Sequence, residues 1–299
     1  MKIRFNFKIS RWANFYFFVQ NLSAWHLSCR RRYNEHWRNT LPVFSEKQEE
    51  LLIEFARIRK EHPEVKSVFE QAFFLSDDPL STLEANLPKK EILMIREIFS
   101  SQKNNFNTIY STEESKLEKW KSKLEESLLG ETLNEAIIKE LSLLFSVEIV
   151  EPISIRVFLL IAPAGHGGMV NMAENTITQD LSNLPLDYSK LVISTIWHET
   201  IHLCFEKPFF RALIKKHAMD REDRMFKYSE IIVSSLFPLG ILGKKFFSLK
   251  ITNDIYSMFK LNESQTGRIM NLTNKYVENE VPFDRAYLIE LDRIIQKNG

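Results

Sequence analysis

The sequence reads H-E-x-x-H from His198 to His202, inside a stretch without glycine or proline that runs from residue 187 to 206. Residues four apart on a helix lie on the same face, so both imidazoles can reach one metal ion. The glutamate after the first histidine can reach a water on that ion and accept its proton. The spacing therefore predicts a helix that carries a zinc site, with His198 and His202 as ligands and Glu199 as general base.

The residues around the motif predict that this helix is buried. Asp187 fits an N-cap, Pro208 ends the run, and Val192 and Ile196 share one apolar side. A His-Glu-His set in a buried helix costs free energy unless a metal or another partner satisfies its polar groups. A metal site is therefore favoured over a surface helix with three incidental polar residues.

A third zinc ligand should follow, because a catalytic zinc usually keeps three protein ligands and one open position. Glu206 lies on the same helix and would sit a turn too far along its axis. Glu222 lies in a charged run, residues 220–224, that reads as a solvated turn or helix start. Glu230 begins an apolar helix that Pro238 ends, and a glutamate on a buried helix needs a partner such as a metal. We predict Glu230 as the third ligand, with Glu222 as the alternative.

The motif and the glutamate that follows it resemble the gluzincin metallopeptidases, the thermolysin-like zinc enzymes. The resemblance covers roughly residues 150–240. It implies that His198 and His202 bind zinc, that Glu199 is the general base, and that a glutamate on a second helix completes the ligand set. The spacing usual in the family lands on Glu222, whereas the helix context favours Glu230.

One position departs from the family pattern. Gluzincins often carry an aspartate four residues after the ligand glutamate, where it orients a ligand histidine. This chain has Ser234 there. A metzincin is disfavoured, because no H-E-x-x-H-x-x-G-x-x-H continuation is present.

Two segments before the motif read as strands. Residues 153–161 are β-branched and apolar, which predicts a buried strand, and residues 169–178 suit an edge strand. By the gluzincin resemblance, residues 171–174 of that edge strand would pair with the backbone of a peptide substrate. His166, in the glycine-rich loop between the strands, is the candidate for stabilising the oxyanion, and His217 and Tyr228 are the alternatives.

The net charge of +1 provides no overall field that would favour nucleic acid or a membrane. The apolar segment at residues 12–19 is too short to span a bilayer, so no stable membrane insertion is expected. The two cysteines, Cys29 and Cys204, do not form the pattern of a disulfide scaffold. The cytoplasm is therefore the expected compartment.

The remaining chain predicts a mostly helical protein. Residues 1–10 alternate apolar and polar side chains, which predicts a strand that joins the central sheet. Residues 11–146 form a helical region, with one helix over 11–38, a capping box at 45–48, and helices near 88–100 and 113–129. Residues 147–240 form the catalytic core, and residues 241–299 are again helical.

We therefore expect one domain over residues 1–299, α+β and predominantly helical. A small mixed or antiparallel sheet would pack on the H-E-x-x-H helix and on the glutamate helix. The expected function is a Zn²⁺-dependent peptidase that hydrolyses a peptide or protein substrate with a zinc-activated water. The alternatives are an inactive protein of this fold that binds a partner, and a regulatory protease that cleaves one specific protein.

Overall fold

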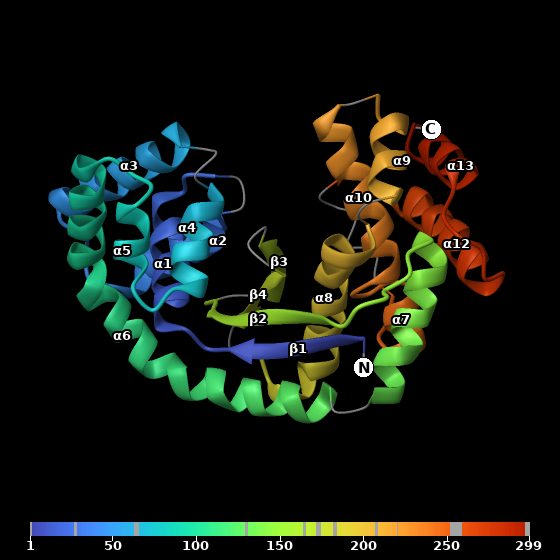
Figure 1. Cartoon of the computed structure of the whole chain (residues 1–299), viewed down its shortest axis with the longest axis horizontal. Coiled ribbons are helices and arrows are strands. Elements are labelled where there is room, and N and C mark those ends of the chain that lie inside the picture. Colours follow the sequence, from blue (N-terminus) through green and yellow to red (C-terminus); the bar gives the residue numbers. More distant parts are fainter. Residues whose placement is uncertain are drawn as a thin grey trace. The chain divides into compact units, whose positions relative to one another are not determined.

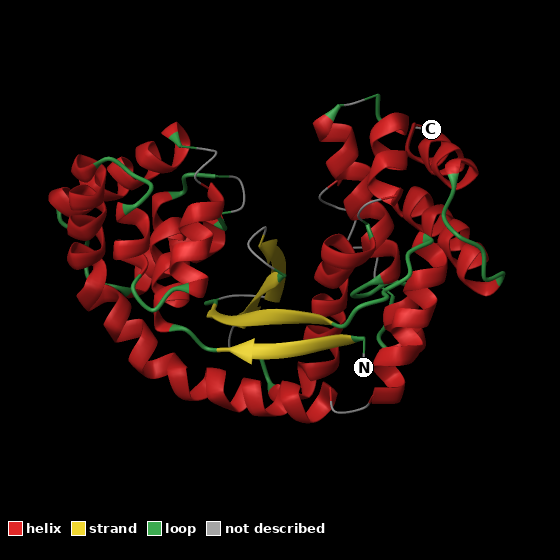
Figure 2. Cartoon of the chain, viewed as in Figure 1, coloured by secondary structure: helices red, strands yellow, loops and turns green. Residues whose placement is uncertain are grey.

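The computed structural model describes residues 2–296 apart from 27–28, 63–65, 129–130, 164–165, 172–174, 182–183, 207–208, 220 and 252–258. Helices dominate these residues, and their four strands form one mixed sheet (Figure 2). The predicted class, α+β and predominantly helical, is confirmed.

Figure 1 labels most of the elements, whose bounds are as follows. The strands are β1 (Ile3–Lys8), β2 (Ile153–Ile161), β3 (His166–Asn171) and β4 (Thr176–Leu181). The helices before β2 are α1 (Arg11–Ser23), α2 (Arg31–Thr40), α3 (Glu46–Glu61), α4 (Lys66–Leu75), α5 (Pro79–Glu84), α6 (Lys89–Leu128) and α7 (Glu131–Phe145). After β4 come the 3₁₀ turn η2 (Leu186–Tyr188), α8 (Ser189–Thr200), the π-helical turn η3 (Ile201–Phe205), α9 (Phe209–His217), α10 (Glu222–Leu236), α11 (Ile241–Phe247), α12 (Glu263–Glu278) and α13 (Arg285–Gln296).

The chain divides into two compact units. Unit 1 comprises Met1–Phe5, Glu126–Ile155 and Asp187–Gly299, and unit 2 comprises Asn6–Glu125 and Arg156–Leu186. This differs from the single domain that the sequence predicts. The boundaries fall inside the regular elements β1, β2 and α6 and at the start of η2, where no glycine-rich or proline-rich linker marks them.

The sheet has the strand order β1-β2-β4-β3, so the amino-terminal strand does join the central sheet as predicted. β2 and β4 run parallel, whereas β3 and β4 are antiparallel. The single edge strand predicted over residues 169–178 is wrong, because the chain reverses there and forms two strands. Asn175, with a φ of 54°, lies immediately before β4, in the left-handed region that asparagine tolerates better than most residues.

Two predicted helix boundaries are also wrong. The helix predicted over residues 11–38 is two helices, because α1 ends at Ala24 in a left-handed conformation with a φ of 49°. The two helices predicted near 88–100 and 113–129 are instead one helix, α6, of 40 residues. The capping box is confirmed. The Ser45 side chain accepts from the backbone N–H of Gln48, and the Gln48 side chain accepts from the backbone N–H of Ser45.

Unit 2 has an aromatic core around α1. Phe15 stacks on Phe106 with ring centroids 4.4 Å apart, and Tyr16 stacks on Phe73 at 4.8 Å. Asn14, also on α1, donates to the Leu159 carbonyl and accepts from the Ile161 N–H, so its amide substitutes for a strand partner of β2.

In unit 2, an ion pair joins Arg30, the N-cap residue of α2, to a buried carboxylate of β4. The carboxylate of Asp180 accepts from Arg30 Nε at 3.1 Å and from the Tyr33 hydroxyl at 3.0 Å. Burial raises the pKa of Asp180, and the charge of Arg30 together with the two hydrogen bonds opposes that rise. Gly167 of β3 lies under the guanidinium, where an added Cβ would come within 2.5 Å of Arg30 Nη2.

Unit 1 is built around α8, which is buried on every side. All its residues are buried except Lys190, and Trp197 packs edge-on against Phe5 of β1 with ring centroids 5.3 Å apart. A helix that is buried around its whole circumference belongs to the core of its unit. The predicted N-cap role of Asp187 is wrong, because Asp187 lies in η2 and no side chain caps α8.

The stretch Glu222–Phe247, which contains α10 and α11, is the one candidate membrane span among the described residues by length and composition. In the structure 56% of its apolar window is buried inside the protein. Core helices of soluble proteins pass the same test, and Glu230 lies within this stretch, so its apolar character is explained by its place in the core of unit 1.

Candidate metal centre

The two histidines of the motif lie at a change of helix type. His198 belongs to the last turn of α8, whereas His202 belongs to the π-helical turn η3 that continues it. The Glu206 N–H donates to the Ile201 carbonyl, five residues earlier, as a π turn requires. Single π turns inside helices are frequent at functional sites. The two imidazole rings are 5.0 Å apart and inclined by 71°.

Glu230 reaches the histidines from α10. It lies two turns after Glu222, which is exposed in the first turn of the same helix. The side chain of Glu230 is 21% exposed. The structure thus brings Glu230 to the two histidines and leaves Glu222 outside their cluster.

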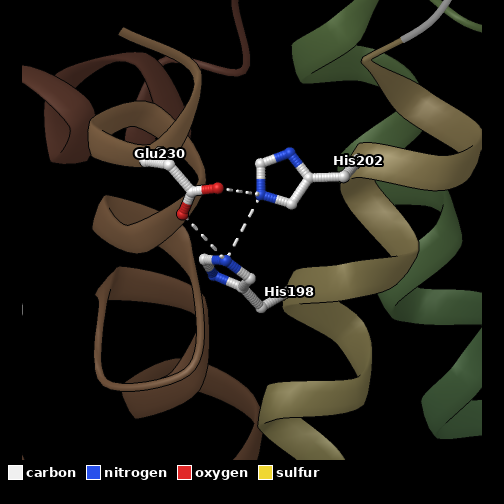
Figure 3. A group of neighbouring side chains, drawn as sticks. All are labelled: His198, His202 and Glu230. Carbon is white, nitrogen blue, oxygen red and sulfur yellow. Dashed lines mark hydrogen bonds and ion pairs between the residues drawn. The ribbon is translucent and has the colours of Figure 1, made fainter. Parts of the chain in front are cut away.

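The nitrogen and oxygen atoms of the three side chains converge on one point. The Nε2 atoms of His198 and His202 are 3.3 Å apart, and the two Glu230 oxygens lie 3.5 Å and 3.4 Å from them (Figure 3). One ligand atom from each residue lies within 4.8 Å of the other two. Each of these atoms carries a lone pair directed at its neighbours, so the group requires a positive charge between them, either a proton or a metal cation.

The other ring nitrogen of each histidine is held by a hydrogen bond. His198 Nδ1 lies 2.8 Å from the Phe237 carbonyl oxygen, just after the end of α10. His202 Nδ1 lies 2.8 Å from Glu206 Oε2 and 3.3 Å from the Ser229 hydroxyl. A carbonyl and a carboxylate only accept, so both Nδ1 atoms donate, and each neutral ring then presents the lone pair of Nε2 to the cluster.

The electrostatics of the cluster favour a cation. Burial lowers the pKa of His198, but the hydrogen bond that its ring donates to Glu230 and the charges of Glu199 and Glu230 outweigh burial and raise that pKa to about 9. Burial raises the pKa of Glu230, and here the hydrogen bond to His198 and the charges of both histidines lower it overall. A positive charge on the His198 imidazole is therefore stabilised despite burial, as it would be on a metal at the same place.

Glu199, the predicted general base, is buried beside the cluster. It is 8% exposed, and its charge is one cause of the raised pKa of His198. A buried carboxylate next to the two imidazoles has the chemistry needed to accept and return a proton.

These positions can be set against known proteins. Comparison with models of protein families, with curated proteins and with solved structures finds no match. The resemblance to gluzincins thus rests on the motif and on the geometry of the three side chains.

Tyr228 and His217, the other predicted site residues whose side chains the structure describes, do not join this cluster. His166 begins β3 in unit 2, and its side chain lies outside the described residues, as do residues 172–174 of the predicted substrate strand. Tyr228 donates its hydroxyl to Asp292, and the ring of His217 packs edge-on against the Tyr228 ring. Neither alternative for the oxyanion role is therefore directed at the three converging side chains.

Glu206 has a role that the sequence does not predict. Its distance along the helix argues against a role as zinc ligand, and it is not part of the cluster of three side chains. In the structure its carboxylate contacts Nδ1 of His202, whereas Nε2 of the same ring faces the cluster. The signal was present in the sequence, because a carboxylate four residues after His202 lies on the same helix face.

Proposed function

We propose that this protein is a zinc-dependent peptidase of the gluzincin type, with His198, His202 and Glu230 as the zinc ligands. The observation that carries the proposal is the convergence of the two Nε2 atoms and the Glu230 carboxylate, with both Nδ1 atoms held by acceptors. A cluster that only stabilised the fold would not need two imidazole rings oriented in this way, because an imidazole is a cation only when it is protonated.

The donor set fits zinc. Two imidazole nitrogens and one carboxylate form the His₂Glu set of catalytic zinc sites, which leaves a fourth position open. Bound zinc would polarise the scissile carbonyl and lower the pKa of the attacking water. The same donors accept other divalent ions, so the elemental analysis described below also identifies the metal.

The chain's own residues would carry the proton transfers. Glu199 accepts a proton from the attacking water and then passes it to the leaving amine, so no covalent acyl-enzyme forms. The Phe237 carbonyl and the Glu206 carboxylate keep the two rings in the tautomer that presents Nε2. Burial of the cluster in unit 1 strengthens each of these interactions, because the local dielectric constant is low.

Elemental analysis of the wild type and three variants tests the metal site. We expect about one zinc per chain, lost in His202→Ala and Glu230→Ala and kept in Glu222→Ala. Glu222→Ala is the matched control, since it removes a glutamate from the same helix without touching the cluster. Loss of zinc in Glu222→Ala with retention in Glu230→Ala would overturn the ligand assignment.

Hydrolysis of a casein and of a quenched fluorescent peptide library tests the chemistry. Glu199→Gln should keep its zinc and lose activity by about 10²- to 10⁴-fold, the usual contribution of a general base. Full activity in Glu199→Gln would contradict the mechanism. Zinc binding with no turnover of any substrate would instead indicate a binding protein, and cleavage of a single protein would indicate a regulatory protease.

A further inference from the structure

The two histidines of the cluster are supported differently. His198 donates from Nδ1 to a neutral backbone carbonyl, that of Phe237. His202 donates from Nδ1 to a carboxylate, that of Glu206. A hydrogen bond to an ionised acceptor is about twice as strong as one between neutral groups, so His202 is held more firmly and is the more electron-rich ring.

Glu206 is itself built into the core of unit 1. Its side chain is 6% exposed, and among the described residues its carboxylate faces three groups: His202, Ser229 and Arg211. Its backbone N–H donates to the Ile201 carbonyl, and its backbone carbonyl accepts from the Arg211 N–H, each at 2.8 Å. A buried carboxylate fixed in this way would be costly unless its charge had a partner, and the imidazole N–H provides one.

Ser229 links this arrangement to the third proposed ligand. It precedes Glu230 on α10, and its hydroxyl lies 3.3 Å from the same Nδ1 of His202. Glu206, the C-cap residue of η3, and Ser229 of α10 therefore contact the same ring atom from two parts of the fold. The contact holds the ring of His202 in place relative to the helix that carries Glu230.

We propose that Glu206 is the positioning residue of the metal centre, the carboxylate that orients His202 and increases the electron density at its Nε2. It takes the role that an aspartate four residues after the ligand glutamate plays in gluzincins, where this chain has Ser234. The carboxylate comes from the H-E-x-x-H helix itself, through the π turn, and not from the glutamate helix. The inference rests on the proposed zinc site.

Zinc affinity measured by chelator competition at constant pH tests this role. Glu206→Gln keeps a hydrogen-bond acceptor of the same size but removes the charge, and we expect it to weaken zinc binding about 10- to 100-fold. Glu206→Asp keeps the charge with a shorter reach and should lie between Glu206→Gln and the wild type. Glu222→Gln is the matched control and should bind zinc as the wild type does.

The visible spectrum of the Co²⁺-substituted protein gives a second reading that a loss of fold would not imitate. We expect the d–d bands to shift in Glu206→Gln, with far-UV circular dichroism unchanged, and to stay in place in Glu222→Gln. Affinity within twofold of wild type and an unshifted spectrum in Glu206→Gln would overturn the role of Glu206 and leave the zinc site intact. A wild type that binds neither zinc nor cobalt would overturn both proposals.

Discussion

The two units each bury a charged cluster, and the clusters differ in how their charge is balanced. In unit 2, Asp180 faces the permanent cation Arg30 and the hydroxyl of Tyr33. In unit 1, Glu230 faces His198 and His202, whose imidazoles are charged only when they hold a proton. The first cluster is electrostatically complete within the chain, whereas the second is complete only with a proton or a metal ion.

This comparison separates a structural ion pair from a candidate metal site. Both are buried, and both contain a carboxylate with hydrogen-bond partners, so burial and charge alone do not distinguish them. The difference lies in the direction of the lone pairs. The donors of Arg30 and Tyr33 point at the Asp180 carboxylate, whereas the Nε2 atoms and the Glu230 oxygens point at one another.

Removal of the metal should have the largest effect, and it should act through unit 1. With zinc at about 1,000 times its dissociation constant, binding to the folded state adds about 4 kcal/mol to the free energy of unfolding. We expect a chelator to lower the melting temperature of the wild type accordingly. His202→Ala should melt at the same temperature with and without the chelator, and a chelator effect that persists in this variant would contradict the site.

Breaking the ion pair in unit 2 should come next, and it should leave the metal untouched. Arg30→Met leaves the buried Asp180 carboxylate with the Tyr33 hydroxyl and the charge of Arg32, and we expect a loss of about 3 kcal/mol in the free energy of unfolding, toward the low end for a buried pair because Arg30 is partly exposed. Denaturant unfolding measures the loss, and elemental analysis should still find zinc. Loss of zinc in Arg30→Met would show that the two clusters are not independent.

The pH dependence of the metal-free protein should show an effect close in size to that of the broken ion pair. The pKa of His198 is about 9 in the folded protein and near 6.5 when unfolded, so its proton stabilises the fold below pH 6.5. That contribution, about 3 kcal/mol, is lost as the pH rises through 9. Melting curves at pH 6.5 and 9.5 measure it.

Zinc should reverse the loss of stability with rising pH, because the metal replaces the proton and binds more tightly to deprotonated imidazoles. The zinc-loaded protein should therefore be at least as stable at pH 8 as at pH 6.5. Without metal, the His198→Gln variant should not show the decline in stability above pH 6.5. A decline of equal size in this variant would assign the titration to another group.

Local patterns in the sequence were sufficient for several elements. The alternation of residues 1–10 predicted β1, because side chains in a strand alternate between faces. The capping box at Ser45 and Gln48 predicted the start of α3, since both contacts lie within one turn. The i,i+4 spacing placed His198 and His202 on one helix face, and burial of its helix singled out Glu230 over Glu222.

What depended on distant contacts was not predictable in the same way. The reversal at Asn175, the continuity of α6 and the division into two units depend on which surfaces pack together, and local propensity does not encode that. The same holds within the site. The sequence predicted His198, His202 and the general base Glu199 from residue type and helical period, and it favoured Glu230 over Glu222 as the third ligand without excluding Glu222. Only the tertiary structure decided that Glu206 and the Phe237 carbonyl support the rings, since any buried acceptor can accept an imidazole N–H and the one that does so depends on packing.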